Sequence, residues 1–186
     1  MTTDDPTTPA IEEDREPLSF RARTARILGL VAALVVIFLW GWALFFPPSK
    51  SAPGTLDDPA FPLAAEQVCT NAAAQLAALP KAFETTDATA RADVIRKSNV
   101  ILKTMVDELD ALPAPADSED ATNVEEWLGD WRTYIGDRAN YATALSSDPK
   151  ARFYVTQKDR RQVTEPIDFF ARFNEMYNCV TPDDTE

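Results

Sequence analysis

Residues 27–46 read ILGLVAALVVIFLWGWALFF, twenty consecutive residues without a charged side chain. At about 1.5 Å of rise per residue, a helix of this length covers the roughly 30 Å hydrocarbon core of a bilayer. No polar face interrupts the run, as it would in an amphipathic helix of a globular domain. The stretch therefore predicts a transmembrane helix.

The two flanks of this run differ in charge, and this difference predicts an orientation. Basic residues gather before the run, whereas Lys50 alone lies close behind it, and tryptophans crowd the exit end. Cytoplasmic flanks carry the excess of Lys and Arg, and aromatic rings settle at the membrane interface. We expect a cytoplasmic N-terminus and an extracytoplasmic C-terminal part. The orienting residues are Arg21, Arg23, Arg26, Trp40 and Trp42.

A cleaved signal peptide is the alternative interpretation, because it also places basic residues before an apolar run. The apolar core of a signal peptide usually has only 7–15 residues and ends in a small-residue cleavage site. Here the run ends in FFPPSKSAPG (45–54), with prolines where cleavage would be expected. The pattern favours an uncleaved anchor in the cell membrane.

The anchor divides the chain into segments of different composition. Residues 1–26 are predicted to be a cytoplasmic tail, acidic and disordered up to its basic end, because they hold few apolar residues to bury. Residues 47–62 carry five prolines and predict an extended stalk. We expect a helical bundle over 63–180 and a C-terminal tail over 181–186.

Apolar residues within the predicted bundle recur at spacings of three and four, which is typical of amphipathic helices. The pattern predicts an all-α fold: one transmembrane helix plus a four-helix bundle with helices over 63–79, 87–112, 122–146 and 164–179. Thr122 and Glu125 stand at capping-box spacing, and Thr164-Glu165-Pro166 resembles a helix start. A short β-hairpin, in which 153–156 pairs with 162–164, is predicted before the last helix.

The chain has two cysteines, and outside the membrane they predict one disulfide, Cys69–Cys179. In an up-down-up-down bundle the end of the fourth helix returns beside the start of the first. The predicted pairing and the even number of helices therefore agree. A redox-active pair is the alternative, but the CxxC spacing is missing.

Composition excludes several classes of function. The chain has 18 basic and 30 acidic residues, a net charge of −12, which argues against nucleic-acid binding. It has no histidine, so that a His-based triad and an imidazole metal site are impossible. Two cysteines cannot build a Cys₄ centre. We expect no cofactor, no metal and no catalytic residues.

Three further patterns have both a structural and a functional interpretation. Arg138 lies on the apolar stripe of the third helix, where an arginine pairs with a carboxylate at the core edge or, less often, anchors a ligand. Acidic pairs on the helices could catalyse glycoside hydrolysis, but they are typical of solvated faces. Aromatic residues at helical spacing indicate a core more than a binding platform; they are Trp127, Trp131, Tyr134 and Tyr141.

The strongest local deviation is a basic loop between the third and fourth helices. Five cations and Asp159 fall within residues 150–161, in a part of the chain that is otherwise acidic. If the bundle rises from the membrane, this loop is expected at its distal tip, where it could meet an anionic cell-wall polymer or an envelope protein. An ordinary solvated loop is the alternative. The cations are Lys150, Arg152, Lys158, Arg160 and Arg161.

The closing stretch RQVTEPIDFFARFNEMYNCVTP (161–182), the N-terminal anchor and Cys69 resemble a group of uncharacterised single-pass membrane proteins from high-GC Gram-positive bacteria. The resemblance implies this architecture and no activity. The sequence predicts a non-enzymatic structural or interaction module of the cell envelope. The alternatives are a ligand-sensing ectodomain that acts through a partner and a carboxylate-based envelope hydrolase. The oligomeric state is left open.

Overall fold

The computed structural model describes residues 20–45 and 54–185. The chain divides into two compact units, Met1–Ser49 and Lys50–Glu186, which are described separately. Most of the predicted cytoplasmic tail, half of the predicted stalk and the side chains of Arg21 and Arg23 lie outside the described residues.

The first unit contains one long helix, α1 (Phe20–Phe45), which begins before the apolar run and includes its basic flank. None of its described side chains, from Thr24 to Trp42, is buried. Arg26, Trp40 and Trp42 are all exposed. Among the described residues, one helix is long and apolar enough to cross a membrane, and this helix is α1.

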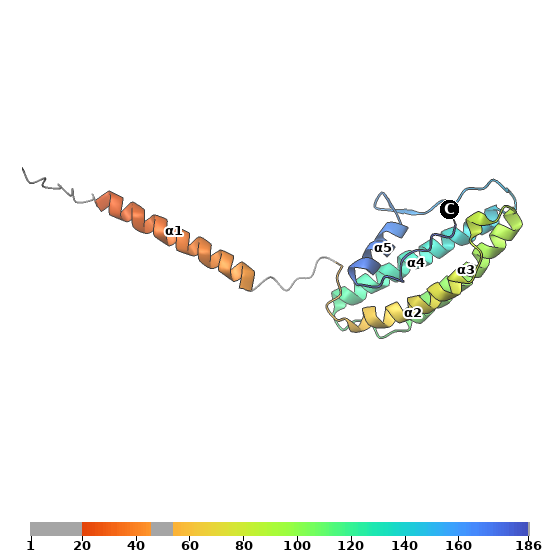
Figure 1. Ribbon diagram of the computed structural model, residues 1–186, viewed down its shortest axis with the longest axis horizontal. Helices are drawn as coiled ribbons and strands as arrows, with labels where there is room; N and C mark the ends of the chain where they lie inside the picture. Colours follow the sequence, from red (N-terminus) through yellow and green to blue (C-terminus); the bar gives the residue numbers. More distant parts are fainter. Residues whose placement is uncertain (1–19, 46–53, 186) are drawn as a thin grey trace, which may run out of the picture. The chain divides into compact units, whose positions relative to one another are not determined.

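The second unit confirms the all-α prediction with four helices in sequence: α2 (Ala60–Ala77), α3 (Ala88–Asp110), α4 (Ser118–Ala144) and α5 (Thr164–Phe173). A short 3₁₀ helix, η1 (Ala82–Glu84), follows α2. The long helix α3 packs between α2 and α4, and α5 packs on α4 (Figure 1). The bundle therefore has three long helices and one short one.

Aspartates begin two of these helices. The Asp87 carboxylate accepts a hydrogen bond from Ala90 N at 2.7 Å, and Asp117 accepts bonds from two backbone N–H groups in the first turn of α4. Such caps satisfy donors that have no partner within the helix. The predicted start at Thr122 was wrong by four residues because Asp117 lies in the proline-containing loop before it. The Thr122 hydroxyl donates to Ser118 O instead.

The last helix is shorter than predicted, ending at Phe173 rather than at residue 179. Asn174 leaves helical geometry and Glu175 has φ 60°, in the left-handed region, which breaks the helix. The Asn174 side chain is held by the N-terminal segment: it donates to Gly54 O at 2.9 Å and accepts from Leu56 N at 2.8 Å. Thr164 starts α5 but its side chain does not cap it.

The same contacts shorten the predicted stalk. Leu56 and Phe61 are buried in the core, and α2 begins at Ala60. Residues 54–62, predicted to be part of an extended spacer, therefore belong to the helical unit.

The predicted hairpin is present with a different register. Strand β1 (Gln157–Lys158) pairs with β2 (Arg161–Gln162), and the two-residue turn consists of Asp159 and Arg160. Both turn residues have positive φ, 52° and 66°. Two-residue hairpins need this conformation because it matches the twist of the strands, although Asn-Gly is the usual sequence. The absence of that sequence explains the misplaced turn.

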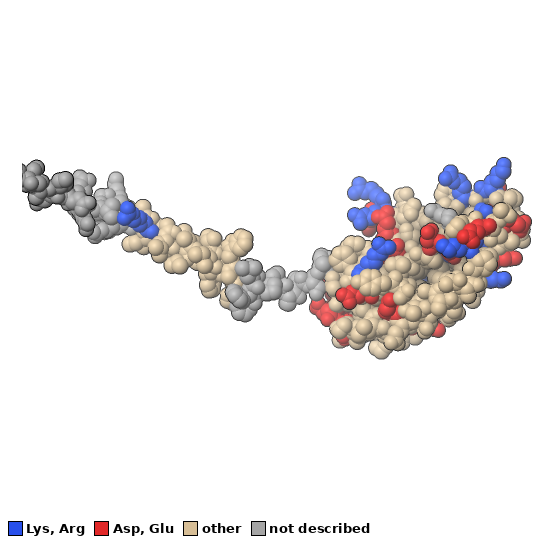
Figure 2. All heavy atoms as spheres, viewed as in Figure 1, with Lys and Arg blue, Asp and Glu red and all other residues tan. Residues whose placement is uncertain are grey.

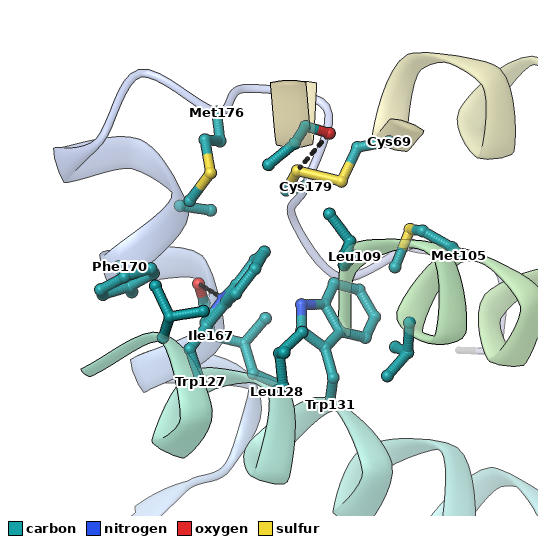
Figure 3. Packing of buried hydrophobic residues seen from close by; sticks show 14 of the residues in the cluster. Cys69, Met105, Leu109, Trp127, Leu128, Trp131, Ile167, Phe170, Met176 and Cys179 are labelled. Carbon is teal, nitrogen blue, oxygen red and sulfur yellow. Dashed lines mark hydrogen bonds between the residues drawn. A yellow bond between two sulfur atoms is a disulfide. The ribbon is translucent and has the colours of Figure 1, made fainter. Parts of the chain in front are cut away.

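The main core surrounds the disulfide (Figure 3). The Trp127 and Trp131 rings from α4 lie beneath it, and Trp127 Nε1 donates to Ile167 O of α5 at 3.2 Å. Cys69 and Cys179 are completely buried, and both belong to this cluster. A second, smaller core lies where α3 meets the C-terminal half of α4, around Ile95. The two cores lie on either side of the buried Arg138 along α4.

Candidate functional site

The cysteine pair is a buried staple. Cys69, in the middle of α2, bonds to Cys179, which lies in the turns after α5 rather than inside a helix. The bond closes a separation of 110 residues and ties the C-terminal segment to α2. Neither sulfur is exposed, so the geometry is that of a structural disulfide.

The C-terminal segment then continues across the bundle to a second attachment. Thr181 bonds to Asp168 of α5, and Asp184 O accepts a hydrogen bond from Ala82 N at 3.0 Å. The Asp184 carboxylate reaches the Arg138 guanidinium on α4 through two bonds of 2.6 and 2.8 Å. The predicted C-terminal tail therefore packs on the bundle through residue 185.

Arg138 is completely buried, and every one of its five N–H donors has an acceptor. Nε donates to Asn99 Oδ1 at 2.7 Å, and the two Nη atoms donate to Asp184, to the Tyr134 hydroxyl and to Ser98 Oγ. A buried cation is tolerated only when it is paired and its donors are satisfied. This network meets both conditions.

Burial and charge act in opposite directions on the pKa of Arg138. Burial lowers it, but the hydrogen bonds that Arg138 donates to Asp184 and the negative charge of that carboxylate outweigh this effect and raise the pKa. For Tyr134 burial dominates and raises the pKa above 10.0, although Arg138 opposes this shift. Arg138 therefore stays charged, and Tyr134 stays neutral, at any physiological pH.

These contacts bear directly on the two interpretations of Arg138. The guanidinium pairs with a carboxylate at the edge of the core, and Asp184 retains only 18% of its side-chain exposure. No donor of Arg138 is left for a ligand in this conformation. The aromatic residues of the same stripe are buried as core; they are Trp127, Trp131, Tyr134 and Tyr141.

Three carboxylates among the acidic pairs of the helices form ion pairs with cations. On α3, Asp107 pairs with Lys103 and Asp110 pairs with Arg132 across to α4. Asp130 is buried and bonds to Lys158. Within the described ranges no group of three His, Cys, Asp or Glu side chains is placed to hold a metal ion.

The predicted basic loop folds back along α4 instead of forming one tip. Asp137 accepts bonds from Thr156 N and Oγ1, and Asp130, seven residues earlier, accepts both contacts of Lys158 Nζ at 2.9 and 3.0 Å. Seven residues are about two helical turns, so both carboxylates lie on one face of α4. The bond to Asp130 raises the pKa of Lys158.

The structure thus separates the five predicted cations into two kinds. Lys158 is neutralised by a buried carboxylate. The other four are exposed and form no ion pair within residues 54–185; they are Lys150, Arg152, Arg160 and Arg161. Figure 2 shows basic and acidic side chains interspersed over the visible face of this unit.

One of these cations lines a groove of about 320 Å³ between α4 and the returning segment. Asp137, Asn140, Arg152 and Tyr154 line it, and Tyr154 is 75% exposed. Tyr141 also lines the groove, and its ring packs against Phe153 with the centroids 5.4 Å apart. The groove gives Arg152 a shaped surrounding that an isolated surface cation would lack.

No pattern in the sequence indicates the polar partners of Arg138. Ser98 and Asn99 lie inside a helical pattern, and Asp184 lies in a short acidic stretch without periodicity. An uncompensated arginine on an apolar stripe was the only available indication that such partners exist.

No protein-family model matches this chain, and comparisons with curated proteins and with solved structures find no match.

Proposed function

We propose that this chain is a non-enzymatic, single-pass anchored module of the cell envelope whose helical unit binds an anionic cell-wall polymer. In this proposal α1 stays uncleaved in the cell membrane, with the N-terminus in the cytoplasm and the helical unit outside. The observation that carries the proposal is a set of four exposed cations that form no ion pair with the residues the structure describes: Lys150, Arg152, Arg160 and Arg161.

Charge supports this assignment because the rest of the unit is acidic. Of the 18 basic and 30 acidic residues of the chain, four and six lie in residues 1–46, which leaves a net charge of −10 for residues 47–186. A protein this acidic repels polyanions unless cations are concentrated locally. The segment 150–161 supplies that concentration, and the groove beside Arg152 offers a place for one unit of a polymer.

Binding to a purified anionic wall polymer tests the proposal. Arg160→Glu/Arg161→Glu should weaken binding by about tenfold, and added salt should weaken the wild type in the same direction. Lys81→Glu/Lys97→Glu is the matched control, because it makes the same charge change at exposed positions elsewhere. Equal affinities for both variants would contradict the proposal. If the Arg160→Glu/Arg161→Glu variant bound the polymer normally but lost binding to an envelope protein, the partner would be an acidic protein and not the polymer.

Orientation has its own experiment. A thiol placed at Ser147 should react with an impermeant maleimide in intact cells, whereas one at Ala10 should not. The native cysteines give no background, since both are in the disulfide. A cleaved signal sequence would instead give a mature protein lighter than the 20.6 kDa of the full chain.

A further inference from the structure

Helix α5 has aromatic residues on both of its faces. Its inner face is buried through Ile167, Phe170 and Ala171. On its outer face the Phe169 and Phe173 rings stack with centroids 4.2 Å apart, yet these side chains are 54% and 44% exposed. Two stacked phenylalanines left in water are unfavourable unless another surface covers them.

Phe173 of the exposed pair borders a groove whose walls are partly apolar. A hollow of about 350 Å³ lies beside Phe173, and its walls include Pro59, Pro62 and Leu63 at the start of α2. Leu63 is 68% exposed. The residues Pro62, Leu63, Phe169 and Phe173 are called the apolar face below.

The apolar face lies at the end of the helical unit where the chain enters from α1. Asn174, the residue after Phe173, bonds to Gly54 O and Leu56 N. Asp57 N donates to the carboxylate of Asp120, in the first turn of α4. The N-terminal end of α4 therefore lies at this end of the helical unit. Tyr154, by contrast, lines the groove beside Ala144, 24 residues and about 36 Å farther along α4.

The connection to α1 is short. Nine residue steps separate Phe45, the last residue of α1, from Gly54. Even a fully extended chain of this length spans only about 30 Å. If α1 spans the membrane, as the proposed function holds, the chain tethers Gly54 within that distance of Phe45, and Gly54 is bonded to Asn174, next to Phe173 of the apolar face.

We propose that the apolar face docks on the membrane surface, with Phe169, Phe173 and Leu63 inserted among the lipid headgroups and the upper acyl chains. Phe and Leu are the residue types that bury into this boundary from amphipathic surfaces. A tether makes such a contact intramolecular, so that a few side chains are enough. A stable dimer needs about 800 Å² from each partner, which four side chains do not supply.

Charges around the apolar face favour neither sign of lipid. Glu66 and Glu175 line the groove, whereas Arg161 lies beside Phe169 at the opposite border and Arg172 follows on α5. The contact therefore rests on apolar insertion. We expect it in vesicles of phosphatidylcholine alone as well as in mixtures with phosphatidylglycerol.

Spin labels on the full chain in such vesicles test the docking. A label at Phe173→Cys should show an oxygen-to-nickel accessibility ratio several-fold above that of a label at Tyr154→Cys, an exposed aromatic residue at the far end of the unit. Equal ratios would overturn the proposal. A ratio that rises with the protein-to-lipid ratio would also overturn it, because a second copy would then be the cover.

A second label separates docking from folding. With a label at Leu63→Cys, the double variant Phe169→Ser/Phe173→Ser should lower the ratio to that of the Tyr154 position, while the tryptophan bands of the near-ultraviolet circular dichroism stay unchanged. An unchanged ratio would overturn the proposal. Extraction by alkaline carbonate reports on α1 independently. Extracted protein contradicts the anchor, whereas retained protein with a water-exposed face contradicts the docking alone.

Discussion

The C-terminal segment is held to the bundle at two points of different chemistry. Cys179 is joined covalently to α2 among apolar side chains, and Asp184, five residues later, is joined by charge to Arg138 among polar ones. A disulfide stabilises mainly by restricting the unfolded chain. A buried ion pair gains little over its desolvation cost, and its removal is expensive chiefly because one charge is left unpaired.

The two attachments therefore respond to different conditions. The disulfide depends on the redox environment and on the length of the closed loop. The ion pair depends on every acceptor around Arg138 and on the protonation state of its neighbours. The following variants are expected to separate the two, and they are ordered by the size of their effect on the free energy of unfolding.

Loss of the disulfide should have the largest effect. Closing a loop of about this length, a separation of 110 residues, is worth about 4–5 kcal/mol in the chain-entropy model. Cys69→Ala/Cys179→Ala should therefore lower the unfolding free energy by about that amount, measured by urea titration in detergent with near-ultraviolet circular dichroism. Wild type treated with reductant is the control. A loss below about 1 kcal/mol would show that the unfolded chain is already restricted by other structure.

Removal of the carboxylate that pairs with Arg138 should come next. Asp184→Asn keeps the shape of the side chain but leaves a completely buried guanidinium without its counter-charge. We expect a loss of about 3 kcal/mol, at the low end for a broken buried pair, because Asp184 is partly reached by water. Asp183→Asn is the matched control on the exposed neighbour. Equal stabilities of these two variants would place the attachment elsewhere in the segment.

A smaller effect is expected from an acceptor that carries no charge. Asn99→Ala leaves Arg138 Nε without its 2.7 Å partner and removes the bond from Asn99 Nδ2 to Ile135 O. Hydrogen bonds to charged groups contribute about 1.5–3 kcal/mol, so a loss of about 2 kcal/mol is expected. Asn140→Ala, at an exposed position on α4, serves as the control. If Asn99→Ala cost as much as Asp184→Asn, the charge of Asp184 would have no special weight.

The sequence predicted the disulfide between Cys69 and Cys179. Of the ion pair, it indicated Arg138 but not its partner Asp184. The cysteines were recognisable because there are two of them and an even number of helices brings their positions together. Arg138 stood out because a cation interrupts an apolar stripe. Asp184 could not be assigned, since its role depends on the path of residues 180–185 across the bundle, and that path follows from tertiary contacts such as Ala82 N to Asp184 O.

Helix existence was predictable and helix ends were not, for the same physical reason. Periodicity records the buried face, and Met176 continues the apolar pattern of α5 beyond its true end. The end is instead decided by Asn174, which bonds to Gly54 and Leu56 from a segment about 120 residues away. The same long-range bonds explain why residues 54–62 belong to the helical unit and not to the predicted stalk.

The smallest effect, and the one that separates the two attachments by pH, is expected at Tyr134. Its hydroxyl donates to Pro182 O at 3.4 Å and accepts from Arg138, so Tyr134→Phe should cost about 0.5–1 kcal/mol at pH 8. Burial raises the pKa of Tyr134 above 10.0 in the folded protein, so its contribution is present below pH 10 and is lost as pH rises through the folded pKa. The cost of Tyr134→Phe should therefore shrink between pH 8 and pH 11, whereas the cost of Cys69→Ala/Cys179→Ala should stay constant because the disulfide does not titrate. Urea titrations at both pH values measure the two differences, and a constant cost for Tyr134→Phe would contradict the assignment of this titration to the network around Arg138.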